Sequence, residues 1–453
     1  MNESTLRLGG TRLLILVLIC FSPIGTRAQQ TSAPSSQQSS AAPLTITLQD
    51  ALVRARTNEP SYTAAVARYG IARQGTTQAR AGMLPSVNYN NQFIYTQGNG
   101  TASGRFIAAN GVHEYLSQGA VHQEFSLQVT AEYRLARAQE ALARANAEIA
   151  ARGLVVTVTQ TYYALVVAQR KYATAQRAAD EAQHFQDITQ KLERGGEVAH
   201  SDTLKAQLQA QQQQRALAEA QLDIERARLD LAVILFPGFN ENFNTVDDLD
   251  NVLPLPSFQE AESQAGQQNP QLAAALASLH EANQEVAVAW GGLLPTLGID
   301  YLYGIDANQF ATNGFDPITK QTFRNLGYGA AATLQIPIWN WGANRSKLRS
   351  AHIARDQAQV ELSFAQRKMV ADLKAFYGEA QTARTELESL RQSSDMAAES
   401  LRLTNLRYQA GEATALEVVD AQNTLTQAQN SLGDGQVRFR VAVANLQTLT
   451  GKF

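Results

Sequence analysis

The chain contains an internal repeat, and this repeat limits the possible folds more than any other feature of the sequence. Motifs from the first half recur in the second half at a nearly constant offset: Asp50-Ala51, Pro60, Leu84-Pro85 and Gly196-Glu197 recur as Glu260-Ala261, Pro270, Leu294-Pro295 and Gly411-Glu412. Self-similarity of this kind indicates that one structural unit has been used twice. We therefore expect each half to contain the same order of helices and strands.

The repeat and the local composition divide the chain into five segments. A stretch rich in Ser, Gln, Ala, Thr and Pro precedes the first copy, and a stretch rich in Asn, Asp and Pro connects the two copies. Such compositions are typical of leaders and connections, because they cannot bury an apolar core. The predicted segments are a signal peptide at 1–28, a flexible leader at 29–43, repeat 1 at 44–235, a connecting segment at 236–256 and repeat 2 at 257–451.

The first residues have the pattern of a secretory signal. Two arginines precede an apolar run at 13–24, and small residues follow that suit cleavage before Gln29. The only cysteine, Cys20, lies inside this segment. Lipidation at Cys20 is an alternative, but Ile19 disfavours it because lipid attachment requires a small residue before the cysteine. The rest of the chain has no thiol, which excludes disulfides and cysteine-bound metals and fits an oxidising periplasm.

The charge balance gives no indication of a nucleic acid partner. The formal net charge is −3, and the arginines are scattered without a basic cluster. Beyond the predicted signal, the chain has no run of about 18 apolar residues that could span a membrane as a helix. Residence in a membrane would therefore require strands, because the backbone must be fully hydrogen-bonded in lipid.

Each copy contains two stretches in which apolar and polar residues alternate, as in strands with one apolar face. In the first copy the apolar positions are Val87, Tyr89, Phe93 and Tyr95, and then Val121, Phe125, Leu127 and Val129. In the second copy they are Leu297, Ile299, Tyr301 and Tyr303, and then Tyr328, Ala330, Ala332, Leu334 and Ile336. Loops at 97–112 and 304–325 separate the two strands of each pair. Strands of about ten residues with long loops on one side are typical of outer-membrane barrels.

Helices are predicted on both sides of each strand pair. The helix before the strands is expected to start at Pro60 or Pro270, with its N-cap two residues earlier, and to end near Gly82 or Gly292. After the strands, apolar residues recur every seven positions, at Leu142, Ile149, Val156 and Tyr163 and again at Leu362, Met369, Phe376, Ala383 and Leu390. This period predicts supercoiled helices, the first of which would extend roughly 90 Å over residues 131–192. Each long helix is expected to turn back at glycines, with return helices that end near Leu235 and Leu449.

These elements predict an α+β membrane protein that is internally duplicated. Four strands per chain cannot close a barrel, and an open sheet edge in lipid would cost several kcal/mol for each unpaired backbone group. Three chains would supply about twelve strands, an even number in the usual range for outer-membrane barrels. We therefore expect a homotrimer with a 12-stranded transmembrane β-barrel, in contact with outer-membrane lipid, and a periplasmic α-barrel built from the long coiled-coil hairpins.

Three features carry a resemblance to a known family. They are the run from Arg407 to Gln422, the paired Asn-Pro or Glu-Pro and Leu-Pro segments, and the run from Leu334 to Gly342. Together they resemble the TolC-type outer-membrane efflux proteins over nearly all of residues 44–451. The resemblance implies a trimeric channel-tunnel in the cell outer membrane, without enzymatic activity or cofactor. It also implies docking to a periplasmic adaptor and an inner-membrane transporter of the RND, ABC or MFS type, which delivers the substrate to a passive exit duct.

The same resemblance implies roles for residues near the helix turns. Glu417 and Asp420 match the family's pore-facing acidic rings, which attract cations when several chains surround a narrow tube. Contacts between hairpins that close the periplasmic tips are implied at Ser201, Asp202 and Tyr408. The family often has an arginine where this chain has Ala413, so one closing contact is expected to be missing.

Two further groups of residues follow from the resemblance. The turns at Gly195, Gly196 and Gly411 are the implied tips for adaptor docking. Pro337 and Gly342 form the Pro-x-x-x-Gly strand-to-helix junction of the second copy. The first copy has neither residue between Ser126 and Arg134, so a looser junction is expected there.

Alternative interpretations of these residues stay open. Glu417 and Asp420 could be solvated charges near a turn, and Asp202 could be the N-cap of the return helix. Catalysis by His200-Ser201-Asp202 is disfavoured because adjacent residues cannot form a triad with each other, and the six histidines show no metal-ligand spacing. A trimeric adhesin would carry its strands at the C-terminus, and a soluble periplasmic adaptor would lack membrane strands. The sequence does not identify the exported substrate.

Overall fold

The computed structural model describes residues 44–95, 113–240, 242–316 and 319–451. The predicted signal peptide at 1–28, leader at 29–43 and loop at 97–112 lie outside the described residues.

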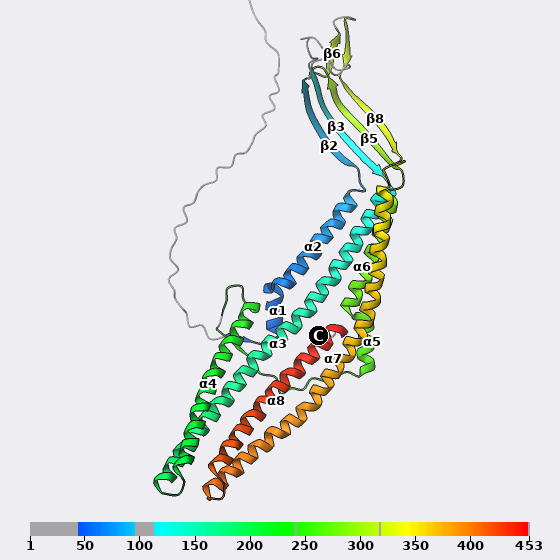
Figure 1. The fold of residues 1–453 in the computed structure, drawn as a ribbon. Coiled ribbons are helices and arrows are strands. Elements are labelled where there is room, and N and C mark those ends of the chain that lie inside the picture. The colour runs from blue at the N-terminus through cyan, green and yellow to red at the C-terminus, as the bar shows by residue number, and fades with distance from the viewer. Residues whose placement is uncertain (1–43, 96–112, 241, 317–318, 452–453) are drawn as a thin grey trace, which may run out of the picture. The chain divides into compact units, whose positions relative to one another are not determined.

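The described chain consists of two series of elements in the same order (Figure 1). The first series comprises β1 (Leu44–Ile46), α1 (Leu48–Asn58), α2 (Pro60–Ala81), β2 (Ser86–Tyr95), β3 (His113–Phe125), α3 (Leu127–Arg194) and α4 (His200–Leu235). β4 (Phe243–Thr245) lies in the connecting segment. The second series comprises α5 (Phe258–Gln268), α6 (Pro270–Gly291), β5 (Thr296–Ala307), β6 (Asn313–Asp316), β7 (Gln321–Arg324), β8 (Leu326–Gln335), α7 (Ala343–Gln409) and α8 (Ala415–Thr450).

Corresponding helices of the two series have nearly equal lengths. α1 and α5 each have 11 residues, α2 and α6 each have 22, and α4 and α8 each have 36. The long helices α3 and α7 have 68 and 67 residues. The predicted duplication is therefore confirmed.

The helices that precede the strands start at Pro60 and Pro270 as predicted, but the predicted N-cap position is wrong. The N-cap is the residue directly before the proline: the Glu59 carboxylate accepts the N–H of Tyr62, and Asn269 caps α6 in the same way. Proline forces the residue before it into an extended conformation, which suits an N-cap and ends the preceding helix. A short helix, α1 or α5, therefore comes before each of them, and the sequence interpretation did not include it.

Asn58, the expected cap in the first copy, has another role. Its amide nitrogen donates to the carbonyl of Leu235 at 2.6 Å, which joins the end of α1 to the end of α4. The side chain thus fixes two helix ends together rather than starting a helix.

The strands form one antiparallel sheet in the order β2-β3-β5-β8 (Figure 1). Its register places Val87 opposite Val121, Val121 opposite Tyr301, and Tyr301 opposite Ala330. Because side chains alternate along a strand, these residues share one face of the sheet. The opposite face contains a His122–Asp300 pair with Nδ1 and Oδ1 2.7 Å apart. The predicted alternation is confirmed for the positions that lie in the four strands, whereas Leu127, Val129 and Ile336 lie outside them.

The boundary between β3 and α3 differs from the prediction. Leu127 and Val129, predicted to lie in a strand, belong to the first turn of α3. The Ser126 hydroxyl accepts the N–H of Val129 at 3.1 Å, so this serine caps the helix one residue after the strand ends. Four residues of alternating pattern fit both periods, and the cap decides in favour of the helix.

The expectation of a looser junction in the first copy is wrong. Ser126 alone separates β3 from α3, whereas residues 336–342 separate β8 from α7. Pro337 lies in this longer connection, and Gly342 is the N-cap of α7 with a φ of 82°. Trp341 precedes it with a φ of 55°. Two successive left-handed residues redirect the chain here.

The predicted loop at 304–325 also needs correction. Its first residues extend β5 to Ala307, and β6 and β7 pair as an antiparallel hairpin within it. Part of the predicted loop therefore consists of strand, and Gly304 and Gly314 lie within β5 and β6.

The long helices pack side by side. α3 packs against α2 and α6 near the sheet and against α4 and α8 farther from it, and α7 packs against α6 and α8 (Figure 1). With 68 residues, α3 is about 100 Å long. At the top of α3, a Cβ on Gly291 would lie 2.8 Å from Cα of Gln128, so glycine permits the close approach of α6. None of the described helices is long and apolar enough to cross a membrane.

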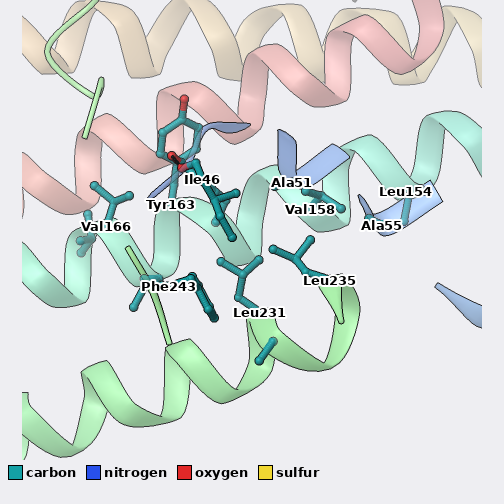
Figure 2. Packing of buried hydrophobic residues seen from close by; sticks show 14 of the residues in the cluster. Ile46, Ala51, Ala55, Leu154, Val158, Tyr163, Val166, Leu231, Leu235 and Phe243 are labelled. Carbon is teal, nitrogen blue, oxygen red and sulfur yellow. Dashed lines mark hydrogen bonds between the residues drawn. The ribbon is translucent and has the colours of Figure 1, made fainter. Parts of the chain in front are cut away.

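A hydrophobic core lies where α1, α3, α4 and the connecting segment meet (Figure 2). β1 and β4 pair in parallel within it, with Ile46 opposite Thr245. The hydroxyl of Tyr162 accepts the N–H of Val246 at 2.9 Å and lies 3.0 Å from the carbonyl of Ile46. Burial raises the pKa of Tyr162 to about 12, so its hydroxyl stays protonated. This core fixes the connecting segment to the first hairpin.

Candidate functional site

Both hairpins turn with the same geometry at the predicted glycines. Gly196 and Gly411 have φ values of 76° and 75°, a left-handed conformation that glycine adopts without a steric cost. The glutamate after each glycine donates its N–H to a carbonyl five residues earlier, over 2.9 Å for Glu197 and 2.8 Å for Glu412. The same motif therefore closes the ends of α3 and α7.

The second turn leads into a better-capped helix than the first. The Thr414 hydroxyl accepts the N–H of Glu417, and the Glu417 carboxylate accepts the N–H and hydroxyl of Thr414 at 3.1 and 3.0 Å. These bonds, assisted by the charge of Arg407, hold the pKa of Glu417 below its ordinary value. In the first turn the N-cap is Ala199, whose side chain makes no capping bond. Glu417 thus has a structural role as part of a capping box.

Glu417 and Asp420 lie on one exposed face of α8. Both side chains are exposed in the single chain, and residues three positions apart in a helix are neighbours on its surface. Ala415 and Val418, in contrast, are buried in a cluster inside the chain. The two carboxylates are consequently turned away from this cluster, as a residue that faces a pore would be.

Tyr408 joins the two hairpins near their tips. Its ring centroid lies 5.0 Å from that of Phe185 on α3, and its hydroxyl lies 3.3 Å from the hydroxyl of the buried Thr189. Ala206, Ala415 and Val418 complete the buried cluster around these rings, and Ala413 packs against it. The sequence singled out Tyr408 but not its partners on α3.

Ser201 and Asp202 have a different environment from Tyr408. Ser201 is exposed, and the Asp202 carboxylate lies 3.2 Å from the Lys205 ammonium on the same helix. Among the described residues, neither side chain forms a hydrogen bond or ion pair with the second hairpin. The alternative interpretation of Asp202 as an N-cap is wrong, because Ala199 occupies that position and Asp202 lies in the first turn of α4.

The neighbouring His200 does not build a catalytic group with these residues. Its Nδ1 lies 2.7 Å from Glu193, across the turn on α3. The described residues also contain no group of three or more His, Cys, Asp or Glu side chains that could hold a metal ion.

A set of amide side chains also bridges the hairpins, and no sequence motif marks it. Gln209 and Gln213 of α4 are buried, and both donate to the side-chain oxygen of Asn423 on α8, at 2.8 and 3.2 Å. Buried amides need partners. A glutamine-rich helix predicts solvent exposure unless the neighbouring helix is known.

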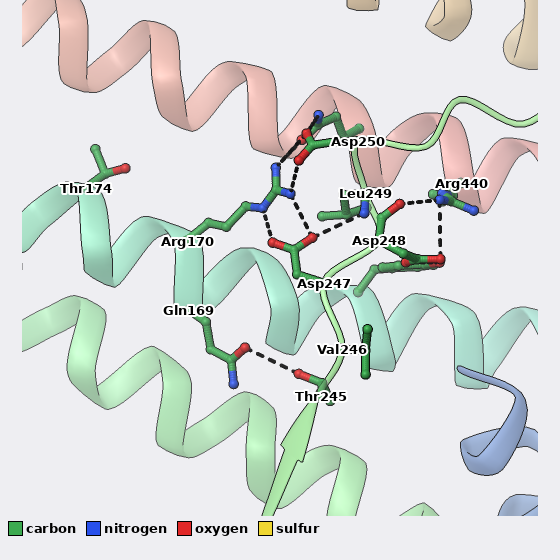
Figure 3. Close-up of polar contacts among 12 residues, drawn as sticks. Gln169, Arg170, Thr174, Thr245, Val246, Asp247, Asp248, Leu249, Asp250 and Arg440 are labelled. Atoms are coloured by element: carbon green, nitrogen blue, oxygen red, sulfur yellow. Dashed lines mark hydrogen bonds and ion pairs between the residues drawn. The ribbon is translucent and has the colours of Figure 1, made fainter. Parts of the chain in front are cut away.

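Farther from the tips, the connecting segment binds both hairpins through two arginines (Figure 3). The Arg170 guanidinium of α3 is paired with the carboxylates of Asp247 and Asp250 and donates to the side-chain oxygen of Gln436 on α8 at 2.8 Å. Gln436 in turn donates to Asp250 at 2.9 Å. The Arg170 hydrogen bond holds the pKa of Asp250 below its ordinary value.

Arg440 of α8 holds the same segment from the other side. It is 7% exposed and donates to the backbone carbonyls of Asp248 and Asn251 at 2.6 and 2.9 Å. Its guanidinium lies 5.3 Å from the ring centroid of Tyr163, whose hydroxyl donates to Asp248 at 2.9 Å. We refer to Arg170, Asp247, Asp248, Asp250, Gln436 and Arg440 as the linker clamp.

The fold and the tips together define a class of protein. Four strands with one apolar face are attached to two long helical hairpins, and an acidic face lies at one tip. A family model described as outer membrane efflux protein matches residues 51–235 and 262–452. The chain therefore belongs to the outer membrane efflux protein family, resides in the cell outer membrane with its helical part in the periplasm, and serves as a channel.

Similarity to individual proteins agrees with this family. The outer membrane protein TolC of Vibrio cholerae is 24% identical over 414 residues, which cover 88% of this chain and 89% of that protein. The alkaline protease secretion protein AprF of Pseudomonas aeruginosa is 23% identical, with 87% and 82% covered. Among solved structures, the outer membrane protein VceC of Vibrio cholerae has a TM-score of 0.76 at 18% identity, with 89% of this chain and 96% of that chain covered. The similarity to this solved structure confirms the predicted fold class.

Proposed function

We propose that three copies of this chain form one exit duct, in which each sheet supplies a third of a closed barrel. The supporting observation is that β2 and β8, the edge strands, have a strand partner on one side only within the described chain. Unpaired backbone groups are too costly in lipid. Pairing of β8 with β2 of the next copy removes every open edge, and three copies give about twelve strands.

Exposed apolar side chains on α7 support the same assembly. Ile353, Val360 and Phe364 are 64%, 67% and 59% exposed, and their spacing places them on one stripe of the helix. Ile71 of α2 is also exposed, at 72%. Stripes of this kind are buried when helices of neighbouring copies pack together.

The duct is the outer-membrane part of a larger assembly. A periplasmic adaptor that docks at the turns around Gly195, Gly196 and Gly411 would bring an inner-membrane transporter of the RND, ABC or MFS type into line with the tube. The transporter supplies the energy and selects the substrate, and the duct itself performs no covalent chemistry. The signal at 1–28 directs the chain to the periplasm and is removed.

The periplasmic tips close the duct when it is idle. The Glu417 and Asp420 carboxylates of three copies surround the lumen there, and they favour cations. Tyr408 and the amide bonds to Asn423 hold the second hairpin against the first, while Ser201 and Asp202 reach the hairpin of a neighbouring copy. The exposure of Ser201 and the position of Asp202 in the first turn of α4 are compatible with such a contact.

The oligomeric state and location test this proposal directly. The mature protein, extracted from isolated outer membranes in mild detergent, should have the mass of three chains by light scattering and should form ion-conducting channels in planar bilayers. Recovery as a monomer in the soluble periplasmic fraction would contradict the proposal.

Neutralising the tip carboxylates should weaken the cation preference of these channels. Asp420→Asn with Glu417→Gln removes two charges per chain, and glutamine preserves the capping box with Thr414. We expect the reversal potential in a salt gradient to move toward that of an unselective pore. Glu412→Gln, a neutralised carboxylate in the turn itself, is the matched control and should change the reversal potential less. Equal potentials for the wild type and the double variant would mean that these carboxylates do not face the lumen.

A further inference from the structure

The contacts that hold the second hairpin (α7 and α8) to the first differ between its root, at the level of the linker clamp, and its tip, at the turn around Gly411. At the root, the linker clamp holds α8 to α3 through two arginines, one of them buried. Nearer the tip, the two hairpins are joined by the Tyr408–Thr189 contact and by the amide bonds to Asn423. Hydrogen bonds from a charged guanidinium are roughly twice as strong as those between neutral groups. The root is therefore the fixed part.

Two glycines interrupt α8 immediately on the tip side of the clamp. Gly433 and Gly435 lie within three residues of each other and directly precede Gln436. The other hairpin helices contain at most one glycine, Gly153 in α3 and Gly378 in α7. Each helical glycine costs about 0.5–1 kcal/mol relative to alanine, so α8 is weakest at this level.

Packing does not require glycine at position 433. Gly433 is buried, yet a Cβ there would meet only Cγ2 of Val167 at 3.7 Å, an ordinary contact. At Gly435 a Cβ would lie 2.5 Å from Cδ1 of Leu390 on α7, so this glycine allows α7 and α8 to approach closely. The first glycine therefore weakens the helix without a steric need, and the second brings the two helices together.

Helix α7 has a matching weak point beside these glycines. Ser393 and Ser394 lie one helical turn beyond Leu390 in the direction of the tip. Serine pairs are among the sites at which helices bend, because serine competes for backbone hydrogen bonds. Both helices of the second hairpin are thus weakened at the same level.

There is also space for movement at this level. A cavity of about 280 Å³ lies between the connecting segment, α7 and α8, and its lining includes Leu249, Leu387, Leu432 and Gln436. The Lys171–Asp434 pair joins residues 433–435 to α3 over 2.7 Å, and its side chains are 38% and 58% exposed. Exposed ion pairs contribute little stability, so this one can break when α8 bends.

We propose that the second hairpin bends at Gly433-Asp434-Gly435 and Ser393-Ser394, while the linker clamp holds its root against the first hairpin. Only the tip-side part of α7 and α8 would then move when the duct opens. This inference rests on the proposed function for its consequence, since a joint matters only in a duct with a closed tip. The joint itself is a property of the helices and can be measured without transport.

Hydrogen exchange on the intact trimer, read by mass spectrometry, tests the joint independently of transport. Amides at 430–436 should exchange faster than those elsewhere in the buried part of α8, and Gly433→Ala should slow them about twofold to fivefold. Gly378→Ala in α7, where a Cβ would have no neighbour within 4 Å, is the matched control and should leave 430–436 unchanged. Uniform exchange along α8 in the wild type would overturn the joint.

Conductance measurements distinguish the proposed bend at residues 433–435 from the proposed closure of the duct at its tip. Tyr408→Phe with Asn423→Ala removes the polar bonds between hairpins at the tip and should raise the open fraction in planar bilayers. Adding Gly433→Ala should lower that open fraction again. A raised open fraction that Gly433→Ala leaves unchanged would overturn the joint but leave the duct standing. If the tip variant does not raise the open fraction, the closed tip of the proposed function is wrong, and the exchange experiment still decides on the joint.

Discussion

Replacing Phe364 with glutamate is expected to leave the chain as a monomer. Phe364 is 59% exposed on α7 and belongs to the same stripe as Ile353 and Val360. If this stripe packs against a neighbouring copy, three glutamates per trimer would be buried without partners. An unpaired buried carboxylate costs several kcal/mol, and threefold symmetry repeats this cost at every interface. Light scattering of the detergent-solubilised protein should therefore show the mass of one chain instead of three.

The matched control is Gln359→Glu, which introduces the same charge on the same helix. Gln359 is exposed and lies off the stripe, so its variant should remain trimeric. Circular dichroism of both variants should match the wild type, which would show that the hairpins still fold. A trimer that survives Phe364→Glu would mean that α7 does not form the interface and that the strands alone hold the copies together.

Replacing Arg440 with alanine is expected to release the connecting segment. Arg440 is 7% exposed and donates to the carbonyls of Asp248 and Asn251, and its loss removes these hydrogen bonds between α8 and the connecting segment. Loss of hydrogen bonds from a charged donor costs about 1.5–3 kcal/mol. Urea unfolding of the trimer, followed by circular dichroism, should show this loss. Chymotrypsin, which cleaves after Phe and Leu, should also cut within residues 236–256 faster than in the wild type.

Arg438→Ala, two residues away on the same helix, provides the control. Arg438 pairs with Glu379 and Glu386 within the second hairpin, and its side chain is 44% exposed. Exposed ion pairs contribute little, so this variant should unfold nearly as the wild type does. Equal losses for the two variants would mean that the stability comes from arginine in general and not from the clamp.

Local sequence patterns predicted the helices, strands and turns best where the pattern fitted only one kind of structure. The tight turns at Gly196 and Gly411 require a residue in the left-handed conformation, and a glycine in the sequence indicates such a position. The seven-residue period of the long helices extends over many turns and has no strand equivalent. At Leu127 and Val129 the signal was ambiguous, because a few alternating residues fit a strand as well as the first turn of a helix.

The candidate site was less predictable for a physical reason. Tyr408 stood in a recognisable motif, but Phe185 and Thr189 lie more than two hundred residues away in the chain and carry no motif of their own. Asp202 sits beside plausible partners in sequence, yet its recorded ion pair is with Lys205 on its own helix. A residue type specifies what a side chain can bind, and the packing of distant helices specifies what it meets.

The sequence by itself determined the duplication, because the same motifs recur at a nearly constant offset. It also determined the two faces of the sheet and the points at which the hairpins turn, because these depend on residues close together in the chain. Only the tertiary structure decided that the connecting segment is a clamp. Its aspartates bind Arg170 and Arg440, which come from different hairpins. That pairing depends on two helices from different repeats lying beside the same segment, and no local pattern encodes it.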